Sequence, residues 1–239
     1  MNDDTPASAR KRLKPIILHQ DDLLIVVNKP AGVWPREGVF DDVGVFDMLA
    51  PDADPDEVPL TQVNAIECEV SGVAIYAAPE PADALRRQFD AGEATLVYNA
   101  IVGGPLLNES GQLPAAGEST HGTNWRVIDA YVGYTMIECV TSNLGEHQLR
   151  RDLQHAGMPL TIDSRYGGAM QLKLSSFKAG YRKSRRRPER PLMERPSVHL
   201  ASASFRHPAD GRELHFEAEP PKDFRALLNQ LDRFGRIPK

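Results

Sequence analysis

The chain has 239 residues, of which 41% are hydrophobic and 26% are charged, and its formal net charge is −5. This composition is ordinary for a globular domain and excludes a wholly disordered or collagen-like chain. The net charge excludes a protein that is cationic all over. It does not exclude nucleic acid as a partner, because phosphate contacts need only one basic face.

The apolar runs are short, and even 70–78, one of the longest, is far from the length that a bilayer requires. The N-terminus begins Met-Asn-Asp-Asp and lacks the basic-then-apolar pattern of a signal peptide. We therefore expect a cytoplasmic protein with no membrane partner. No feature of the sequence indicates the oligomeric state.

Cysteine and histidine do not occur in metal-binding patterns. Cys68 and Cys139 lie far apart, outside any Cys-x-x-Cys spacing, and the seven histidines are dispersed along the chain. We expect neither a disulfide framework nor a metal centre. The two cysteines are typical of small buried hydrophobic residues.

The N-terminal half begins with a polar stretch, 1–14, which carries a basic cluster at 10–14. We expect a flexible basic arm there, followed by one large domain at 15–239. Two short strands are predicted from Ile16, separated near 20–22 and ended by Pro30 and Gly32. The Asp- and Pro-rich stretch 51–59 is predicted to be a surface loop, because it buries too little apolar area to order a core element.

Further along, strand and helix patterns alternate. The apolar segment 70–78 predicts a buried strand, and Pro81 suits the first turn of a helix over 79–90. A strand is predicted at 94–102 and a hairpin at 125–140 that turns near 132–133. Helices are predicted at 146–156 and at 222–234, where an apolar stripe indicates packing on a core. Many strands and few helices favour an α+β fold with a mostly antiparallel sheet.

One stretch, 182–195, is strongly basic. It contains seven basic residues and only two acidic ones, Glu189 and Glu194, so its local charge is +5. Composition alone does not distinguish a solvated loop from a patch that faces phosphates. The basic residues are Arg182, Lys183, Arg185, Arg186, Arg187, Arg190 and Arg195.

Several blocks in chain order resemble the RluA family of RNA pseudouridine synthases, over nearly the whole chain. The most specific are the Asn-Lys-Pro-x-Gly turn at 28–32, the segment 64–73 in the place of the family's His-Arg-Leu-Asp-x-x-Thr-Ser-Gly signature, and His-Gln-Leu-Arg at 147–150. Their order and spacing carry the resemblance. Further blocks that follow the family lie at 17–22, 85–89, 98–102, 155–160, 163–168, 199–200, 205–212 and 220–224.

This resemblance implies a central, mostly antiparallel sheet with flanking helices and an RNA-binding cleft. It also implies isomerisation of uridine to pseudouridine in structured RNA, ribosomal or transfer, without a cofactor or a metal. We expect no separate accessory RNA-binding domain. The family's catalytic aspartate falls on Glu67, whose stem is longer by one methylene. Neighbouring positions depart as well: Asn64 and Ala65 replace His-Arg, and Glu146 adds a negative charge where RNA is expected.

Other residues match family positions and are candidates for the site. By resemblance, Arg150 is expected to pair with the catalytic carboxylate, and its planar fork suits a bidentate bond to Glu67; a structural ion pair is the alternative. Tyr98 is expected to pack against the target base, or to be a half-buried strand tyrosine. Lys29, His147 and Gln148 are candidates for RNA contact, against roles in turns, capping and packing. By resemblance, part of the basic stretch falls where family members carry a loop beside the cleft, which favours phosphate contact. These residues are Arg182, Lys183, Arg185, Arg186 and Arg187.

Three functions are open on this reading. The chain is an active synthase that uses Glu67, an inactive homologue that still binds RNA, or a protein whose former cleft contacts another protein. Phosphate binding weakens as salt rises, which separates the first two from the third.

Overall fold

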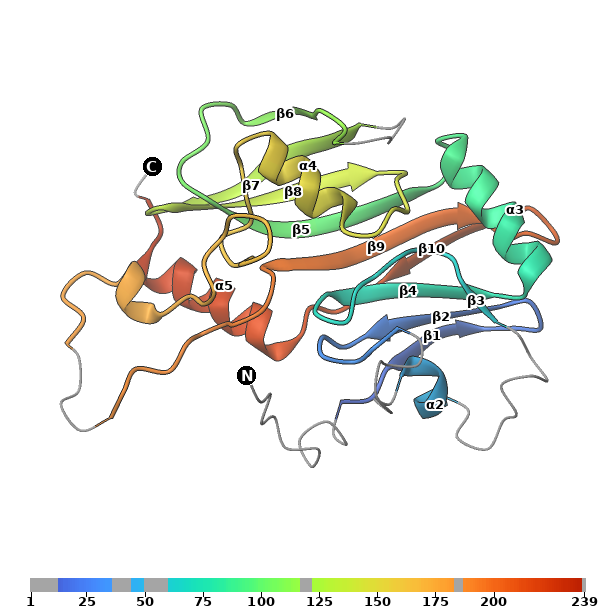
Figure 1. Cartoon of the computed structure of the whole chain (residues 1–239), viewed down its shortest axis with the longest axis horizontal. Coiled ribbons are helices and arrows are strands. Elements are labelled where there is room, and N and C mark those ends of the chain that lie inside the picture. The colour runs from blue at the N-terminus through green and yellow to red at the C-terminus, as the bar shows by residue number, and fades with distance from the viewer. Residues whose placement is uncertain (1–12, 36–43, 50–59, 117–121, 183–186, 238–239) are drawn as a thin grey trace.

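The computed structural model describes residues 13–35, 44–49, 60–116, 122–182 and 187–237. Within these residues the strands form one ten-stranded sheet, in the order β1-β2-β4-β9-β5-β8-β7-β6, with β10 beside β9 and β3 beside β4 (Figure 1). The first strands are β1 (Ile16–Gln20), β2 (Leu24–Lys29), β3 (Thr61–Gln62), β4 (Ser71–Ala77) and β5 (Thr95–Gly103). The others are β6 (Ser110–Leu113), β7 (Thr123–Tyr131), β8 (Tyr134–Thr141), β9 (Val198–Arg206) and β10 (Glu213–Glu217).

The sheet confirms the predicted α+β class and its mostly antiparallel pairing. Every pairing among the described strands is antiparallel except that of β4 with β9, which is parallel over Ser71 and Gly72. All seven residues of β4 are buried, whereas β8 alternates between buried and half-buried positions. A strand that is buried on both faces has a continuous apolar sequence. For this reason the apolar segment 70–78 predicts a buried strand correctly.

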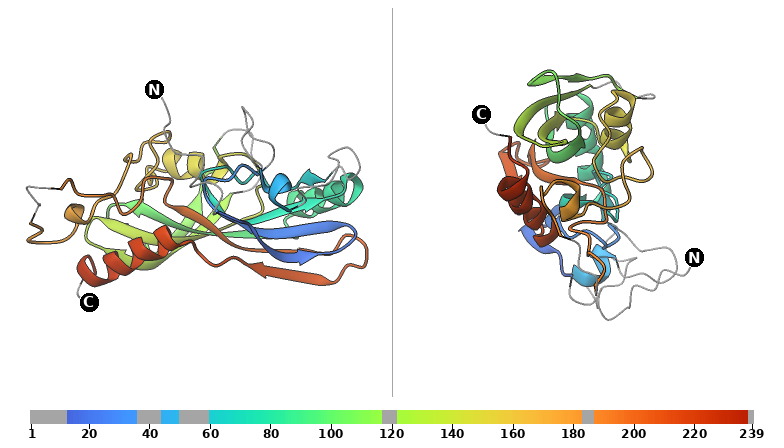
Figure 2. Two further views of the ribbon diagram at one scale, coloured as in Figure 1. Left: turned by 90° about the horizontal axis from the view of Figure 1, so that it is seen from below. Right: turned by 90° about the vertical axis from the view of Figure 1, so that its left-hand side faces the viewer.

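Helices cover both faces of the sheet, as Figure 2 shows for α4 and α5, which lie on opposite sides. The helix α3 begins at a proline and buries Leu85 and Phe89. In α5 the predicted apolar stripe is core, because Phe224, Leu227 and Leu231 have no exposed surface. The described helices are α2 (Val45–Leu49), α3 (Pro79–Asp90), α4 (Gln148–His155), α5 (Lys222–Phe234) and the 3-10 turn η1 (Leu174–Ser176). No helix among the described residues is long and apolar enough to cross a membrane.

The predicted hairpin turns at Val132 and Gly133, as expected, between β7 and β8. Four short elements were not predicted, namely α2, β3, β6 and η1, because segments of two to five residues carry too few positions to show a period. The loop predicted at 51–59 and most of the basic arm predicted at 1–14 lie outside the described residues.

The seam between β4 and β9 joins the two halves of the sheet. The hydroxyl of Ser71 donates to Nδ1 of His199, 2.9 Å away, and Nε2 of His199 donates to the carbonyl oxygen of Ala218 at 2.8 Å. This assignment makes His199 neutral, with its proton on Nε2. At Gly72, where φ is +130°, the two strands approach so closely that a Cβ atom would collide with the carbonyl oxygen of Leu200.

We expect Gly72→Ala to destabilise the fold by about 3 kcal/mol or more, because it combines a forbidden backbone angle with a collision between backbones. Gly133→Ala is the matched control, since φ is +79° there but nothing lies within 4 Å of the added atom. It should cost only about 1–2 kcal/mol. Denaturant unfolding of both variants measures the difference, and equal losses would contradict the close contact at the seam.

A second prediction concerns acid stability. Burial, helped by the positive charge of Arg195, lowers the pKa of His199 below its ordinary value near 6.5. The unfolded chain therefore binds a proton at His199 that the native state does not, so the native state loses stability as the pH falls below about 6.5. Thermal unfolding between pH 7.5 and 5 should show a steeper loss for the natural protein than for His199→Asn, which does not titrate; parallel curves would contradict this.

Candidate active site

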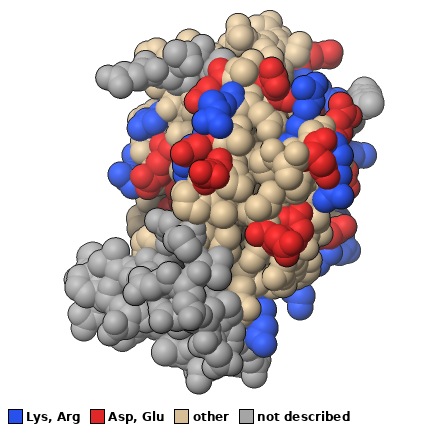
Figure 3. All heavy atoms as spheres, turned by 90° about the vertical axis from the view of Figure 1, so that its right-hand side faces the viewer, with Lys and Arg blue, Asp and Glu red and all other residues tan. Residues whose placement is uncertain are grey.

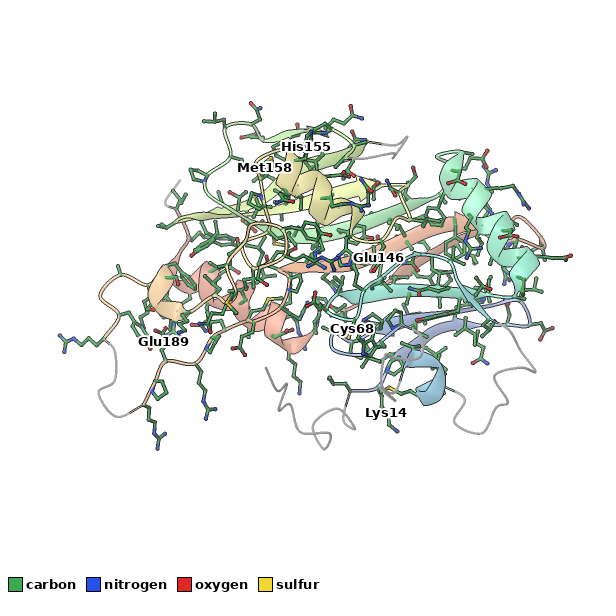
Figure 4. All side chains as sticks on the ribbon, viewed as in Figure 1. Lys14, Cys68, Glu146, His155, Met158 and Glu189 are labelled. Atoms are coloured by element: carbon green, nitrogen blue, oxygen red, sulfur yellow. The ribbon has the colours of Figure 1, made fainter. Side chains whose placement is uncertain are left out.

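A groove of about 870 Å³ opens on the face of the sheet that carries α4. Its walls come from the loop before β4, the turn that begins α4, and the segments 162–165 and 194–196. In Figure 4, Cys68 and Glu146 mark the first two of these near the middle of the molecule. A second, much smaller cavity of about 20 Å³ lies beside it, and Ala65, Glu67, His147 and Arg150 line both.

The loop that carries Glu67 is fixed by hydrogen bonds to the sheet. The side chain of Asn64 donates to the carbonyl oxygen of Val73 and accepts the N–H of Ile75, each at 2.9 Å. The N–H of Ala65 donates to the carbonyl oxygen of Leu144 at 3.2 Å. Asn64 therefore anchors the loop and is itself buried.

The carboxylate of Glu67 is held at one oxygen only. Oε1 accepts the backbone N–H of His147 at 2.9 Å, and the side chain is 15% exposed. Within the described part of the chain, no hydrogen bond engages Oε2. Glu67 thus has one oriented oxygen and one oxygen available in the groove.

His147 owes its position to an unusual backbone conformation. It caps α4 with φ +57° and is the only residue other than glycine with a positive φ among those described. Such a left-handed conformation costs on the order of 1 kcal/mol, and here it aims the N–H at Glu67. Nη1 of Arg150 donates to Nδ1 of His147 at 2.8 Å, so the neutral ring carries its proton on Nε2, 3.3 Å from Oε1 of Glu146.

Arg150 does not pair with Glu67 as we expected. Its fork binds Asp163 instead, with Nε 2.7 Å from Oδ2 and Nη2 2.8 Å from Oδ1, and both side chains are buried. Burial alone lowers the pKa of Arg150, but the hydrogen bonds and charge of Asp163 outweigh it and raise the pKa. The cause of the difference is geometric: the planar fork is saturated by Asp163, and only Nη1 remains for the groove, where it contacts His147.

Tyr98, on β5, lines the small cavity together with Glu67. Burial raises the pKa of its hydroxyl well above the ordinary value of 10, and the nearby negative charge of Glu67 adds to this. Tyr98 is therefore a neutral hydrogen-bond donor at any physiological pH. The structure brings together Tyr98, Glu67, Arg150 and His147, all of which the sequence singled out.

Two expected RNA contacts are contradicted by burial. Lys29 has no exposed surface, and its ammonium group donates to the carbonyl oxygens of Pro30, Val33 and Cys68 at 2.9–3.2 Å. Burial lowers the pKa of Lys29 to about 7. Lys29 ties the turn after β2 to the loop of Glu67 and does not reach a phosphate.

Gln148 is likewise occupied within the fold. Its Nε2 donates to the carbonyl oxygen of Ala116 and to Oδ1 of Asp152, both at 2.7 Å, and its Oε1 accepts from Arg151 at 2.6 Å. Both ends of the amide are bonded within the fold and 6% of the residue is exposed, so Gln148 has a packing role in this structure.

The basic stretch extends to one end of the molecule. Lys183, Arg185 and Arg186 lie outside the described residues, whereas Arg182 and Arg187 are exposed. Glu189 marks this loop at the left in Figure 4, away from Cys68 and Glu146. Of its described residues, only Glu194 and Arg195 line the groove. Arg195 forms a bidentate pair with Asp223 at 2.6 and 3.0 Å.

Comparison with known proteins bears on what this groove is. No protein-family model matches the chain. An uncharacterised RNA pseudouridine synthase of Chlorobaculum parvum is 31% identical over 95% of the chain and 77% of its own length. The chain belongs to the RluA-type family of RNA pseudouridine synthases. Other RluA-type relatives are the ribosomal large subunit pseudouridine synthases D of Neisseria meningitidis serogroup B (28% identity, 90% of the chain) and C of Escherichia coli (26%, 92% of the chain).

The chain spans 60% of the length of the Neisseria relative and 70% of the Escherichia coli one. Solved structures agree with the pseudouridine synthase-like fold that the sequence implied. Human RNA pseudouridylate synthase domain containing 4 superposes with a TM-score of 0.65 over 97% of both chains at 19% identity. Domain containing 1 superposes with a TM-score of 0.60 over 87% of this chain and 84% of its own at 16% identity.

Sequence reasoning missed Asp163, the partner that Arg150 selects. The block 163–168, which resembles the family, could have indicated it, because a tight turn there brings the carboxylate of Asp163 to Arg150. In this turn the N–H groups of Tyr166 and Gly168 donate to the carbonyl oxygen of Asp163 at 3.1 and 2.8 Å.

The described residues contain no group of three His, Cys, Asp or Glu side chains that could hold a metal ion.

We expect Asp163→Ala to cost about 3–5 kcal/mol in the free energy of unfolding, because it leaves the buried guanidinium of Arg150 without a counter-charge. The matched control is Asp129→Ala, which removes an exposed partner of Arg236 at 3.4 Å and should cost less than about 1 kcal/mol. Denaturant unfolding measures both. Similar losses in the two variants would show that the buried pair does not organise the site.

Proposed function

We propose that this protein isomerises uridine to pseudouridine in structured RNA, with Glu67 as the reacting carboxylate. The observation that supports this most directly is the state of Glu67. One oxygen is oriented by the N–H of His147, and the other is unengaged among the described residues, in a groove where Tyr98 and Arg150 lie close by.

The reaction sets definite demands on a site. The bond from C1′ of the ribose to N1 of uracil breaks, the base turns, and a bond from C1′ to C5 forms. The proton on C5 leaves and N1 gains one, so the composition is unchanged and no cofactor is required. A carboxylate next to C1′ stabilises the positive charge that develops there, and a carboxylate or a buried hydroxyl moves the proton. Glu67 and Tyr98 supply these two kinds of group.

The longer stem of Glu67 fits the way in which this site is built. Because the fork of Arg150 is bound to Asp163, the carboxylate reaches the N–H of His147 instead of a guanidinium. Placement matters here, since about 1 Å of misplacement costs on the order of a hundredfold in rate. We infer that the glutamate and its hydrogen bond to His147 are matched to one another.

For the substrate we propose large-subunit ribosomal RNA, because relatives of the chain are named as ribosomal large subunit pseudouridine synthases. The reacting uridine must leave its stack to reach Glu67 in the groove. We further propose that the basic stretch, through Arg182, Lys183, Arg185, Arg186 and Arg187, contacts phosphates at a distance from the reacting nucleotide.

The alternative, a homologue that binds RNA without modifying it, receives no support from the names of the relatives. It still makes a distinct prediction. Affinity for RNA that falls with salt, together with no pseudouridine formed at any position, would favour binding alone.

The proposed function predicts that Glu67→Gln abolishes activity, since the amide keeps the shape but removes the charge. Unmodified total RNA from a strain lacking the gene is incubated with each protein, and pseudouridine is mapped chemically. The natural protein should restore at least one site, and the variant should lower its rate by a hundredfold or more, in line with the usual worth of an acid–base group, ~10²–10⁴-fold.

Glu67→Asp is the sharper variant, because it restores the residue that the family carries. The shorter stem withdraws the carboxylate from the N–H of His147, so we expect a slower reaction, by about tenfold or more. An increase in rate would contradict a site matched to glutamate and would point to a degenerate one. Absence of any modified site with the natural protein would overturn the proposed function itself.

A further inference from the structure

The groove is unusually poor in available positive charge for a surface that binds RNA. Its described lining carries five carboxylates against only three guanidinium groups. The carboxylates belong to Glu67, Glu69, Glu146, Asp163 and Glu194, and the guanidinium groups to Arg150, Arg165 and Arg195. On the end of the molecule that carries α3, acidic and basic side chains of the described residues are interspersed (Figure 3).

Two of the three arginines are committed within the fold. Arg150 is 3% exposed and its fork holds Asp163. Arg195 is 13% exposed and holds Asp223 with two hydrogen bonds. Neither has its planar fork free to bind a phosphate. The third, Arg165, is exposed and forms no ion pair among the described residues.

Arg165 is nevertheless held in a defined place. Its guanidinium carbon lies 5.7 Å from the centre of the Tyr166 ring, and its Nη1 lies 3.3 Å from Nε2 of His147. The same His147 ring faces Glu67, with Nδ1 3.4 Å from Oε1. Arg165 and Glu67 are thus separated by the width of one imidazole ring.

The contact with His147 uses at most one of the five N–H donors of Arg165. Nε2 of His147 accepts from Nη1 of Arg165 only in the tautomer whose proton is on Nδ1. Apart from Nη1, the donors of the Arg165 side chain have no acceptor among the described residues. On the other side of Glu67, Ala65 also lines the groove but offers only a methyl group.

We propose that Arg165 is the positioning residue that binds an RNA phosphate next to the nucleotide facing Glu67. This inference rests on the proposed function and adds the contact that fixes the substrate backbone. Stacking on Tyr166 orients the guanidinium plane, and the open fork suits two oxygens of one phosphate. In a groove whose other charges are mostly negative, this one cation carries a large share of the local attraction.

The test compares Arg165→Gln with Arg225→Gln, which removes an exposed arginine from α5 on the opposite face of the sheet. The probe is unmodified large-subunit ribosomal RNA made by transcription, with affinity measured over a range of salt concentrations. We expect Arg165→Gln to lower affinity about tenfold. The slope of log affinity against log salt should fall by about 0.7–0.9, the effect of one phosphate. Arg225→Gln should change neither.

Kinetic measurements distinguish a phosphate contact of Arg165 from a role in the stability of the fold. Arg165→Gln should raise KM with little change in kcat and in the melting temperature, and Arg165→Lys should recover the salt slope but only part of the affinity, because it lacks the fork. An unchanged affinity and slope in Arg165→Gln would overturn this inference while leaving the activity of the natural protein intact. A natural protein that neither binds nor modifies the RNA would overturn the proposed function, and this inference with it.

Discussion

The buried ion pair between Arg150 and Asp163 organises the site. It joins the first turn of α4 to the loop that follows this helix, and both partners are almost fully buried. A buried pair of this kind contributes little net stability, but the loss of one partner is costly, so it fixes a geometry more than it stabilises a fold. The remaining nitrogen of Arg150, Nη1, donates to the ring of His147 and orients it. The backbone N–H of His147 in turn orients the carboxylate of Glu67.

The consequence is a carboxylate that is oriented by a backbone N–H and not by a guanidinium. A backbone donor does not change with a point mutation of its own side chain, but its direction depends on the left-handed conformation of His147. The strain of this conformation is held by the bonds of its neighbours, as is common where a site is pre-organised. The carboxylate of Glu67 and the left-handed conformation of His147 are thus two parts of one arrangement.

The sheet supplies the rigid frame for these loops. The seam between β4 and β9 has no room for a side chain at Gly72, and the loop of Glu67 enters β4 directly before it. Lys29 connects two of these segments, because its ammonium group donates to carbonyl oxygens on both the turn after β2 and the loop of Glu67. A lysine that looks available in the sequence is thereby a buried crosslink between two segments of backbone.

The sequence by itself determined the class of fold, the helices α3 and α5, the hairpin of β7 and β8, and the residue set around Glu67, because local periodicity and the order of short blocks are properties of neighbouring residues. Only the tertiary structure decided how the charged groups pair. Arg150 binds Asp163 and not Glu67. The side chains of Lys29 and Gln148 are buried and bonded within the fold. Of the three arginines that line the described groove, only Arg165 forms no ion pair with a described carboxylate. The physical reason is that an ion pair or hydrogen bond depends on distances of a few ångströms between segments far apart in the chain, which no local pattern records.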